Sequence, residues 1–331
     1  MTSLKIYIYL VVAPQTKIPT AGNFSTIIMA AGMGKRMFSK IPKILHPIMG
    51  KHVIRFVVDL AREISSSEVI VVVGASGLQV KKILGDSVRY AVQPIPRGTG
   101  DAVQKGLAVS RHPNILILSG DVPLLQKKTI QEMIEEHAAE RAALTFLTCD
   151  FVNPQGYGRV VRDRKNKVVK IVEDSDASST QKKIREINAG IYFVRRELLR
   201  KALQKVDAHN QQGEYYLPDI VREILSRREK VVGFKAAAEE EIVGINNQLD
   251  LERVRTLIKN RWFAELLKRG IRIEDPATTN IDLTVKLGDH VRIRPYTFLE
   301  GRTRIPSGQT VGPFVWIRDN RVLFTGKADL R

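Results

Sequence analysis

A glycine-rich loop followed by two cations is the part of the sequence best suited to chemistry. The loop is Ala30-Ala31-Gly32-Met33-Gly34, and Arg36 and Lys43 follow it. Glycines let backbone N–H groups approach phosphate oxygens, and a helix that starts there favours an anion. The two cations could hold a triphosphate and neutralise the charge that develops as pyrophosphate leaves. The loop lacks the third glycine of the dinucleotide fingerprint and the Gly-Lys-Ser/Thr end of a P-loop, so alone it is weak evidence.

The segments around this loop alternate between short β-branched runs and amphipathic stretches. We predict strands over residues 26–30, 69–73, 88–92 and 115–118, and helices around residues 52–64 and 100–110. Continuous apolar strands separated by helices indicate an α/β fold with a doubly wound, mostly parallel sheet covered on both faces. Ligands of such sheets bind at the carboxyl ends of the strands, which is where the glycine-rich loop lies.

The alternation of strand-like and helical segments ends after Cys149. Strand-like segments at residues 157–162, 168–173 and 188–194 are joined by polar turns, which predicts an inserted substrate-binding layer. A long helical pattern from Gln248 to Lys268 closes this part, and Gly270 is placed to end the helix.

The last part of the sequence repeats with a period of six residues. Aliphatic residues recur at every sixth position: Ile281, Leu287, Ile293, Leu299, Ile305, Val311, Ile317 and Leu323. Such hexapeptides are typical of a parallel β-helix, in which each repeat forms one side of a triangular coil and points its aliphatic residue inward. The alternative, an irregular tail with scattered aliphatic residues, is much less favoured after eight matches. The run is long enough for about two coils.

Composition narrows the class of protein. The chain has 331 residues, of which 44% are hydrophobic and 27% charged, which suits one large soluble domain plus a smaller one. The single cysteine, Cys149, excludes a disulfide framework and fits a reducing compartment, so we expect a cytoplasmic protein. The apolar run at residues 4–12 is about half the ~20 residues of a membrane helix, and no Ala-x-Ala cleavage site follows it. A loosely attached extension is therefore favoured over a signal peptide.

The net charge of +18 raises the hypothesis of nucleic-acid binding. However, Lys and Arg residues are dispersed along the chain, and many lie on helical faces such as residues 223–230 and 253–269. Neither zinc-finger spacing nor an aromatic RNA-binding signature accompanies them. A positive surface also suits an enzyme with phosphorylated substrates, so we expect no specific nucleic-acid partner and no membrane partner.

A series of short motifs extends the pattern over about residues 25–317. After the loop come Arg36-Met37, Pro42-Lys43-Ile44-Leu45-His46, Gln93, Gly98-Thr99-Gly100, Gly120-Asp121-Val122-Pro123-Leu124, Gly156-Tyr157-Gly158-Arg159, Ile171-Val172-Glu173, Glu186-Ile187-Asn188-Ala189-Gly190-Ile191, Gly213-Glu214-Tyr215-Tyr216 and Gly244-Ile245-Asn246-Asn247. This series resembles the bifunctional N-acetylglucosamine-1-phosphate uridylyltransferase/glucosamine-1-phosphate acetyltransferase family. The resemblance implies an extension over 1–22, a Rossmann-like nucleotide-diphospho-sugar transferase domain over 23–250, a linker helix over 251–275 and a truncated left-handed β-helix over 276–331.

The resemblance also implies a role for each matched residue. Nucleotide binding is implied for Ala30, Ala31, Gly32, Gly34, Lys43, Gln93, Gly98, Thr99 and Gly120, with the Gln93 amide reading uracil. Sugar binding is implied for Gly158, Glu173 and Asn188, and Mg²⁺ binding for Asp121 and Asn246. Arg36, Lys43 and Asp121 are implied to be catalytic. Each of three residues has a purely structural interpretation when taken alone: a turn acid for Asp121, a surface acid for Glu173 and a strand-end cap for Asn188. Because all three occur in the order of the family motifs, the functional interpretation is favoured.

The implied reaction converts UTP and N-acetylglucosamine-1-phosphate to UDP-N-acetylglucosamine and pyrophosphate, a step in the synthesis of cell-wall peptidoglycan precursors. The attacking phosphate oxygen is already anionic, so catalysis needs positioning and charge neutralisation by Mg²⁺, Lys43 and Arg36 rather than a general base. Two alternatives stay open. One is a nucleotidyltransferase for another sugar phosphate or nucleotide, and the other is a non-catalytic nucleic-acid-binding protein.

The sequence departs from the family pattern at three places. Lys35 stands where the family commonly has Thr, and Asp101 where a His often follows Gly-Thr-Gly. The family's acetyltransferase domain is a long β-helix, whereas this repeat is short and His290 is the only histidine after residue 275. We therefore expect acetyltransferase activity to be absent, while the short coil could pack against its copies and hold a homotrimer.

Overall fold

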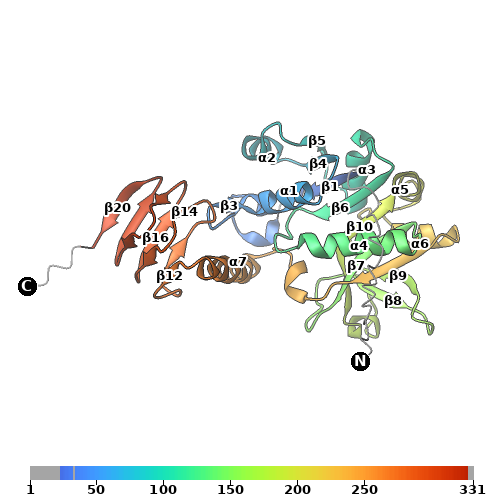
Figure 1. Cartoon of the computed structure of the whole chain (residues 1–331). Coiled ribbons are helices and arrows are strands. Elements are labelled where there is room, and N and C mark those ends of the chain that lie inside the picture. Colours follow the sequence, from blue (N-terminus) through green and yellow to red (C-terminus); the bar gives the residue numbers. More distant parts are fainter. Residues whose placement is uncertain (1–22, 33, 327–331) are drawn as a thin grey trace, which may run out of the picture.

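The computed structural model describes residues 23–32 and 34–326 (Figure 1). The extension at residues 1–22, with its apolar run, lies outside the described residues. A nine-stranded sheet forms the larger part, with the order β11-β7-β10-β6-β1-β4-β5 and the strands β8 and β9 attached to β10. Its strands are β1 (Phe24–Ala30), β4 (Glu68–Val73), β5 (Arg89–Val92), β6 (Asn114–Ser119), β7 (Leu144–Asp150), β8 (Arg159–Arg162), β9 (Val168–Val172), β10 (Glu186–Arg195) and β11 (Val231–Lys235).

The sheet is mostly parallel, as predicted. Strand β1 pairs in parallel with β4 and β6, β4 with β5, and β7 with β11. Strand β10 runs antiparallel to both β6 and β7. The hairpin of β8 and β9 joins β10 through the pair Ile187 and Arg159, and it forms two of the three predicted strands of the inserted layer. The third, residues 188–194, belongs instead to β10 inside the main sheet, between β6 and β7.

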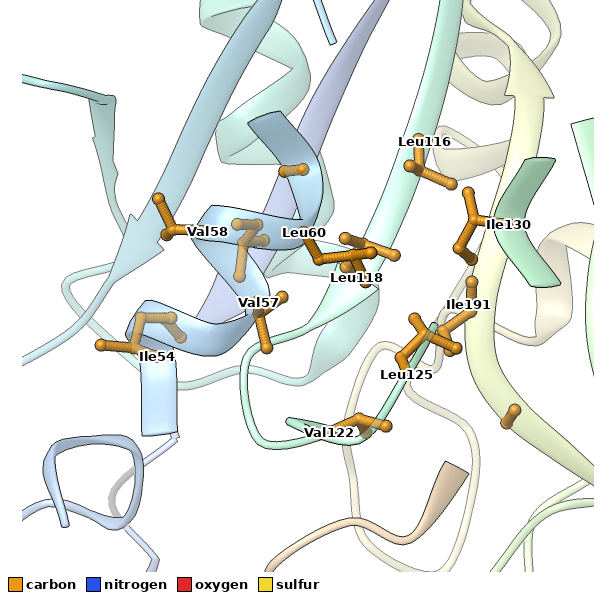
Figure 2. Packing of buried hydrophobic residues seen from close by; sticks show 14 of the residues in the cluster. Ile54, Val57, Val58, Leu60, Leu116, Leu118, Val122, Leu125, Ile130 and Ile191 are labelled. Carbon is orange, nitrogen blue, oxygen red and sulfur yellow. The ribbon is translucent and has the colours of Figure 1, made fainter. Parts of the chain in front are cut away.

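Helices cover both faces of this sheet. One face carries α1 (Val53–Glu63), α2 (Gly77–Leu84) and α4 (Lys127–Ala139), and the other carries α3 (Thr99–Val109), α5 (Arg196–Leu203) and α6 (Asp219–Ser226). Strand β6 shows why its run is continuously apolar: Leu116 and Leu118 belong to the first core, and Ile115 and Ile117 to the second. Figure 2 shows Leu116 and Leu118 between Leu60 of α1 and Ile130 of α4.

Helix α7 (Gln248–Lys268) lies between the sheet and the C-terminal coil, and its bounds agree with the predicted helix (Figure 1). The Asn247 side chain caps its first turn by accepting a hydrogen bond from the N–H of Asp250 at 2.9 Å. Gly270 follows its end with φ +80°, a left-handed conformation that stops a helix. No helix within residues 23–32 and 34–326 is long and apolar enough to cross a membrane.

The predicted hexapeptide repeat forms a parallel coil, as expected for a left-handed β-helix. Its strands are β12 (Arg272–Ile273), β13 (Asn280–Ile281), β14 (Lys286–Leu287), β15 (Arg292–Ile293), β16 (Thr297–Glu300), β17 (Arg304–Ile305), β18 (Thr310–Val311), β19 (Val315–Arg318) and β20 (Arg321–Thr325). The first eight of these strands form three faces, β12-β15-β18, β13-β16-β19 and β14-β17, with parallel pairing throughout. Ile281 pairs with Leu299, and Leu299 with Ile317, so the period of six places one aliphatic residue on each side of each coil.

The prediction that Leu323 continues the repeat is wrong. Strand β20 runs antiparallel to β19, and the Leu323 side chain is 49% exposed. Asp319 and Asn320 both have positive φ, at 51° and 64°, which is the conformation of a two-residue hairpin turn. The chain therefore doubles back after Ile317 and leaves the coil.

A third core joins the coil to the larger domain. It contains Met37 and Ile245 near the carboxyl edge of the sheet, Leu266 of α7, and Ile281 and Leu299 of the coil. Hydrogen bonds reinforce the junction: the N–H of Leu283 donates to the Met49 carbonyl at 3.0 Å, and Arg269 donates to the Leu287 carbonyl at 3.1 Å. The coil is therefore packed against the domain rather than tethered to it. The other short elements are the hairpin of β2 (Pro47–Ile48) and β3 (Lys51–His52), and the 3-10 helices η3 (Gln181–Lys183) and η4 (Glu239–Ile242).

Candidate active site

A cavity of 250 Å³ opens at the carboxyl edge of the sheet, where the fold class predicts a ligand. The structure brings eight of the predicted site residues into its wall: Ala30, Ala31, Gly32, Lys43, Gln93, Gly98, Thr99 and Asp121. Met29, Ile44, Pro96, Ala102, Ser119 and Glu214 complete the wall. Residues separated by more than 180 positions in the sequence therefore share one small space.

Two predicted nucleotide-binding glycines lie behind this wall instead. A Cβ at Gly34, which has φ +66°, would lie 2.7 Å from the Cβ of Lys43, so glycine there lets the loop pass close to Lys43. A Cβ at Gly120 would lie 2.8 Å from the carbonyl oxygen of Met29, so glycine there lets β6 continue tightly beside β1. Both residues shape the cavity through the backbone.

The helix expected after the glycine-rich loop is much shorter than the prediction assumed. The loop leads into the 3-10 helix η1 (Lys35–Met37), and a second one, η2 (Lys43–Leu45), carries the cation. Single turns have little dipole to offer an anion. Backbone N–H groups and the two cations are therefore the groups here that could attract an anion.

A cluster of four polar groups lies beside the cavity. The ammonium of Lys43 forms an ion pair with the carboxylate of Asp121 and lies 3.4 Å from the Asn246 amide oxygen Oδ1. The guanidinium of Arg36 donates to the same Oδ1 at 3.4 Å. The side chains of Lys43 and Asp121 are only 15% and 19% exposed, so their attraction is screened less than that of a surface pair.

The backbone holds the two oxygen-bearing residues of this cluster in place. Asp121 follows β6, and its carbonyl accepts a hydrogen bond from the N–H of Ile245 at 3.0 Å. The N–H of Asn246 donates to the Asp250 carboxylate at 2.9 Å. The end of β6 and the start of α7 are therefore fixed together, although they are far apart in the sequence.

The Asp121 and Asn246 oxygens fit a magnesium site. Both already face one cation, the Lys43 ammonium, so they create negative potential at a shared point. A carboxylate and an amide oxygen are hard ligands, and Mg²⁺ commonly takes its remaining positions from water and phosphate. Within the described part of the chain, no cluster of three or more His, Cys, Asp or Glu residues offers an all-protein cage.

Gln93, which follows β5, lines the same cavity and is only 3% exposed. Its Nε2 donates to the carbonyl of Gly98 at 3.0 Å and to the carboxylate of Asp101 at 2.8 Å. Gly98 has φ +113°, and a Cβ there would lie 2.6 Å from the Tyr215 carbonyl oxygen. The Thr99 hydroxyl accepts from the N–H of Leu217 at 3.0 Å. Residues 93–99 are therefore clamped against the segment at 215–217.

The three predicted sugar-binding residues also come together. The Gly158 carbonyl accepts from the N–H of Asn188 at 2.8 Å, and a Cβ at Gly158 would lie 3.3 Å from Glu173 Oε1. The Asn188 amide accepts from the N–H of Gly190 at 3.1 Å. A Cβ at Gly190 would in turn lie 3.2 Å from the hydroxyl of Ser119, which lines the cavity. The register of β10 shifts between Asn188 and Tyr192, and Glu173 lines a separate cavity of 260 Å³.

Glu173 has an unusual electrostatic environment. Burial raises the pKa of its carboxyl group to about 7, and the charges of Asp219, Asp176 and Asp174 add to the rise. The nearby Arg159 lowers the pKa by a smaller amount. This group therefore changes charge close to neutral pH, whereas an ordinary glutamate does so near 4.3.

Several residues near the site were not assigned a role from the sequence. Burial raises the pKa of the Tyr157 phenol, and the backbone of Gly244 lowers it by a smaller amount. Its position inside the motif Gly156-Tyr157-Gly158-Arg159 was the available signal. Ser119 and Glu214 line the cavity, and each adjoins or belongs to a motif that the sequence analysis singled out.

Comparisons with known proteins agree with this architecture. A family model described as a MobA-like NTP transferase domain matches residues 26–216. The bifunctional protein GlmU of Caldanaerobacter subterraneus subsp. tengcongensis is 40% identical over 298 residues, which are 90% of this chain and 65% of that protein. GlmU of Syntrophomonas wolfei is 36% identical over 300 residues, covering 90% of this chain and 67% of that protein. A solved chain from Bacillus anthracis, described as a glucose-1-phosphate thymidylyltransferase, has a TM-score of 0.61 at 18% identity and covers 71% of this chain and 94% of that chain.

The fold and the cation-lined cavity define a nucleotidyltransferase. Within that class, the chain belongs to the family of the bifunctional GlmU proteins. It spans about two thirds of their length, with 65% of each of the first two relatives aligned.

Proposed function

We propose that the protein is a cytoplasmic, Mg²⁺-dependent uridylyltransferase that converts UTP and N-acetylglucosamine-1-phosphate to UDP-N-acetylglucosamine and pyrophosphate. The observation that carries the proposal is the meeting of Lys43, Asp121 and Asn246 beside a cavity that Gln93 also lines. This arrangement offers a cation site for phosphates and a polar amide for a base around one cavity. The names of the relatives support the class of reaction.

The mechanism follows from the positions of the chain's own groups. The loop of Ala31 and Gly32 offers backbone N–H groups to the triphosphate, and Lys43 and Arg36 neutralise charge as pyrophosphate leaves. When bound by Asp121 and Asn246, Mg²⁺ would act as a Lewis acid on the phosphate oxygens. The sugar phosphate needs no base, because its attacking oxygen is already anionic, so the site works by orientation and electrostatics.

The cluster of Gly158, Glu173 and Asn188 supports an acetylated amino sugar as the acceptor. A carboxylate and an amide, separated by a glycine that leaves space, can bind sugar hydroxyls and an acetamido N–H at the same time. An enzyme for another sugar phosphate or nucleotide is the second candidate, since the fold also occurs in the thymidylyltransferase-like chain.

One assay tests this proposal. Pyrophosphate release is measured with UTP in the presence and absence of N-acetylglucosamine-1-phosphate, and then with glucose-1-phosphate and with dTTP. We expect release only with Mg²⁺ and fastest with the UTP and N-acetylglucosamine-1-phosphate pair. A faster reaction with another pair would favour the second candidate, and no release with any pair would disprove the enzyme class.

Two further properties stay predictions. We expect the 331-residue chain not to acetylate glucosamine-1-phosphate from acetyl-CoA, because the eight parallel strands of its described coil make fewer than three turns. Thiol release above background would contradict this.

We also expect a homotrimer held by the coil, and sedimentation at the mass of a single chain would contradict it.

A further inference from the structure

The side-chain amide of Gln93 is bonded on its nitrogen side only. Its two N–H groups have two partners, the Gly98 carbonyl at 3.0 Å and the Asp101 carboxylate at 2.8 Å. Among the residues that the structure describes, no donor bonds to the other end of the amide, Oε1. Gln93 lines the cavity, so Oε1 is the group that it can offer to a ligand.

The identity of Asp101 fixes this orientation. A glutamine amide can be turned over to exchange its oxygen and nitrogen, and partners that both donate and accept would allow either arrangement. A carbonyl and an ionised carboxylate only accept. Turning the Gln93 amide over would point Oε1 at two acceptors, so Nε2 must face Gly98 and Asp101.

Two features of the surroundings hold the Asp101 carboxylate in place. Asp101 lies in the first turn of α3, where the helix dipole favours a negative charge, and Lys105 Nζ lies 3.6 Å from its Oδ1. The residue is only 7% exposed and lines a neighbouring cavity of 660 Å³, whose wall does not include Gln93. It therefore acts on the nucleotide cavity through Gln93 and does not itself line it.

We propose that Asp101 is a positioning residue for base selection: it holds Gln93 with Oε1 toward the nucleotide, so that the site requires a base with a ring N–H on its Watson–Crick edge. This inference rests on the proposed nucleotidyltransferase function and specifies the class of nucleotide. Uracil meets the requirement through N3–H. Cytosine carries a lone pair at the same ring nitrogen, so two acceptors would face each other and neither would be satisfied.

The first test uses the wild-type protein and measures nucleotide affinity by calorimetry in the presence of Mg²⁺. We expect CTP and 3-methyl-UTP to bind about tenfold or more weakly than UTP, because each leaves a buried acceptor without a donor. 5-Methyl-UTP carries the same extra methyl group at another position and controls for bulk, so its affinity should stay close to that of UTP. Equal affinities for UTP, CTP and 3-methyl-UTP would overturn the inference.

The second test separates an acceptor role from a packing role. Asp101→Asn keeps the size but can present a donor, so it permits the turned-over amide; Asp101→Glu keeps an acceptor-only group. Hydrogen bonds to a charged group are about twice as strong as neutral ones, so we expect Asp101→Asn to lower the ratio of UTP to CTP affinity about fivefold. Asp101→Glu should keep the ratio even if both affinities fall, and Asp59→Asn, which lies outside the cavity wall, should keep it as a charge control.

The outcomes distinguish this inference from the proposed function. An unchanged ratio in Asp101→Asn, or an equal fall in Asp101→Asn and Asp101→Glu, would overturn the role of Asp101. If UTP binds with the expected selectivity but no sugar nucleotide forms, the proposed reaction fails while the role of Asp101 stands. If the wild-type protein binds no nucleotide, both are wrong.

Discussion

In the proposed reaction, the Asp121 carboxylate has two possible cation partners, the Lys43 ammonium and Mg²⁺. In the structure its carboxylate is bonded to Lys43, while Asn246 faces the same ammonium. A divalent cation would compete for these oxygens, and the released ammonium would then be free to bind phosphate. The pair is therefore suited to exchanging one cation for another as the nucleotide enters.

This arrangement predicts the effect of Asp121→Asn. We expect turnover to fall at least about 100-fold, because loss of a metal ligand removes several kcal/mol of transition-state stabilisation. The melting temperature should stay near that of the wild type, since the substitution keeps the shape of a partly exposed side chain. Asp59→Asn, which breaks the ion pair with Lys51 away from the cavity, is the matched control. Near-normal turnover in Asp121→Asn would contradict the assignment.

Glu173 provides a prediction about pH. Its folded-state pKa of about 7 lies above the ordinary value, so the folded protein binds its proton more tightly than the unfolded chain does. The stabilisation from this group is complete at pH values below about 4.3 and is lost as the pH rises to about 7. Glu173→Gln should therefore melt about 2 °C or more above the wild type at pH 8, and close to it at pH 5.

The measurement is a pair of melting curves at each pH, with Glu132→Gln on the exposed face of α4 as a control for a lost surface charge. Equal differences in melting temperature between variant and wild type at pH 5 and pH 8 would show that burial does not hold the Glu173 proton.

For individual residues, the resemblance predicted which residues meet, but it could not predict the contact of Asp101 with Gln93. That contact depends on the turn between β5 and α3, which only the folded backbone defines.

At the scale of elements, β20 shows what a repeat pattern can and cannot predict. Ile317 and Leu323 obey the same period of six, yet β19 continues the coil and β20 reverses beside it. The signal for the reversal was the pair Asp319 and Asn320, because these residue types tolerate positive φ. Likewise, the apolar runs predicted the strands β1, β4, β5 and β6 to within about two residues, but not the antiparallel direction of β10. The direction of β10 depends on how the chain passes through the β8 and β9 hairpin before it enters the sheet, and the periodicity of the sequence carries no information about that path.

The different environments of two leucines give a matched test. Leu299 is fully buried in the coil and Leu323 is 49% exposed. Leu299→Ala should lower the free energy of unfolding by about 2–5 kcal/mol, because it leaves a cavity in a packed core. Leu323→Ala should change it by less than about 1 kcal/mol. Equal losses in chemical denaturation of the two variants would show that the coil continues through β20.

For the whole molecule, the net charge of +18 is a long-range property rather than a local site. A positive field attracts anionic substrates, and salt screens it over about 10 Å at 0.1 M ionic strength. We expect the KM for UTP to rise severalfold between about 0.05 and 0.3 M NaCl, with kcat changing much less. A KM that does not respond to salt would exclude phosphate steering. Tight, salt-sensitive binding to DNA without any pyrophosphate release would instead favour the non-catalytic alternative.

The shared third core joins the segment beside Asn246 to the coil. Ile245, next to Asn246, packs in the same cluster as Leu266 of α7 and Leu299 of the coil. A fluctuation that opens the coil therefore removes support from one of the two oxygens proposed to hold Mg²⁺, although the coil lies at the far side of α7 (Figure 1). Amide hydrogen exchange at Ile245 should accelerate in Leu299→Ala, while exchange in β7 and β10 should not. If so, on heating the protein would lose the arrangement of Asp121 and Asn246 when the coil opens, whether or not the coil also binds a partner.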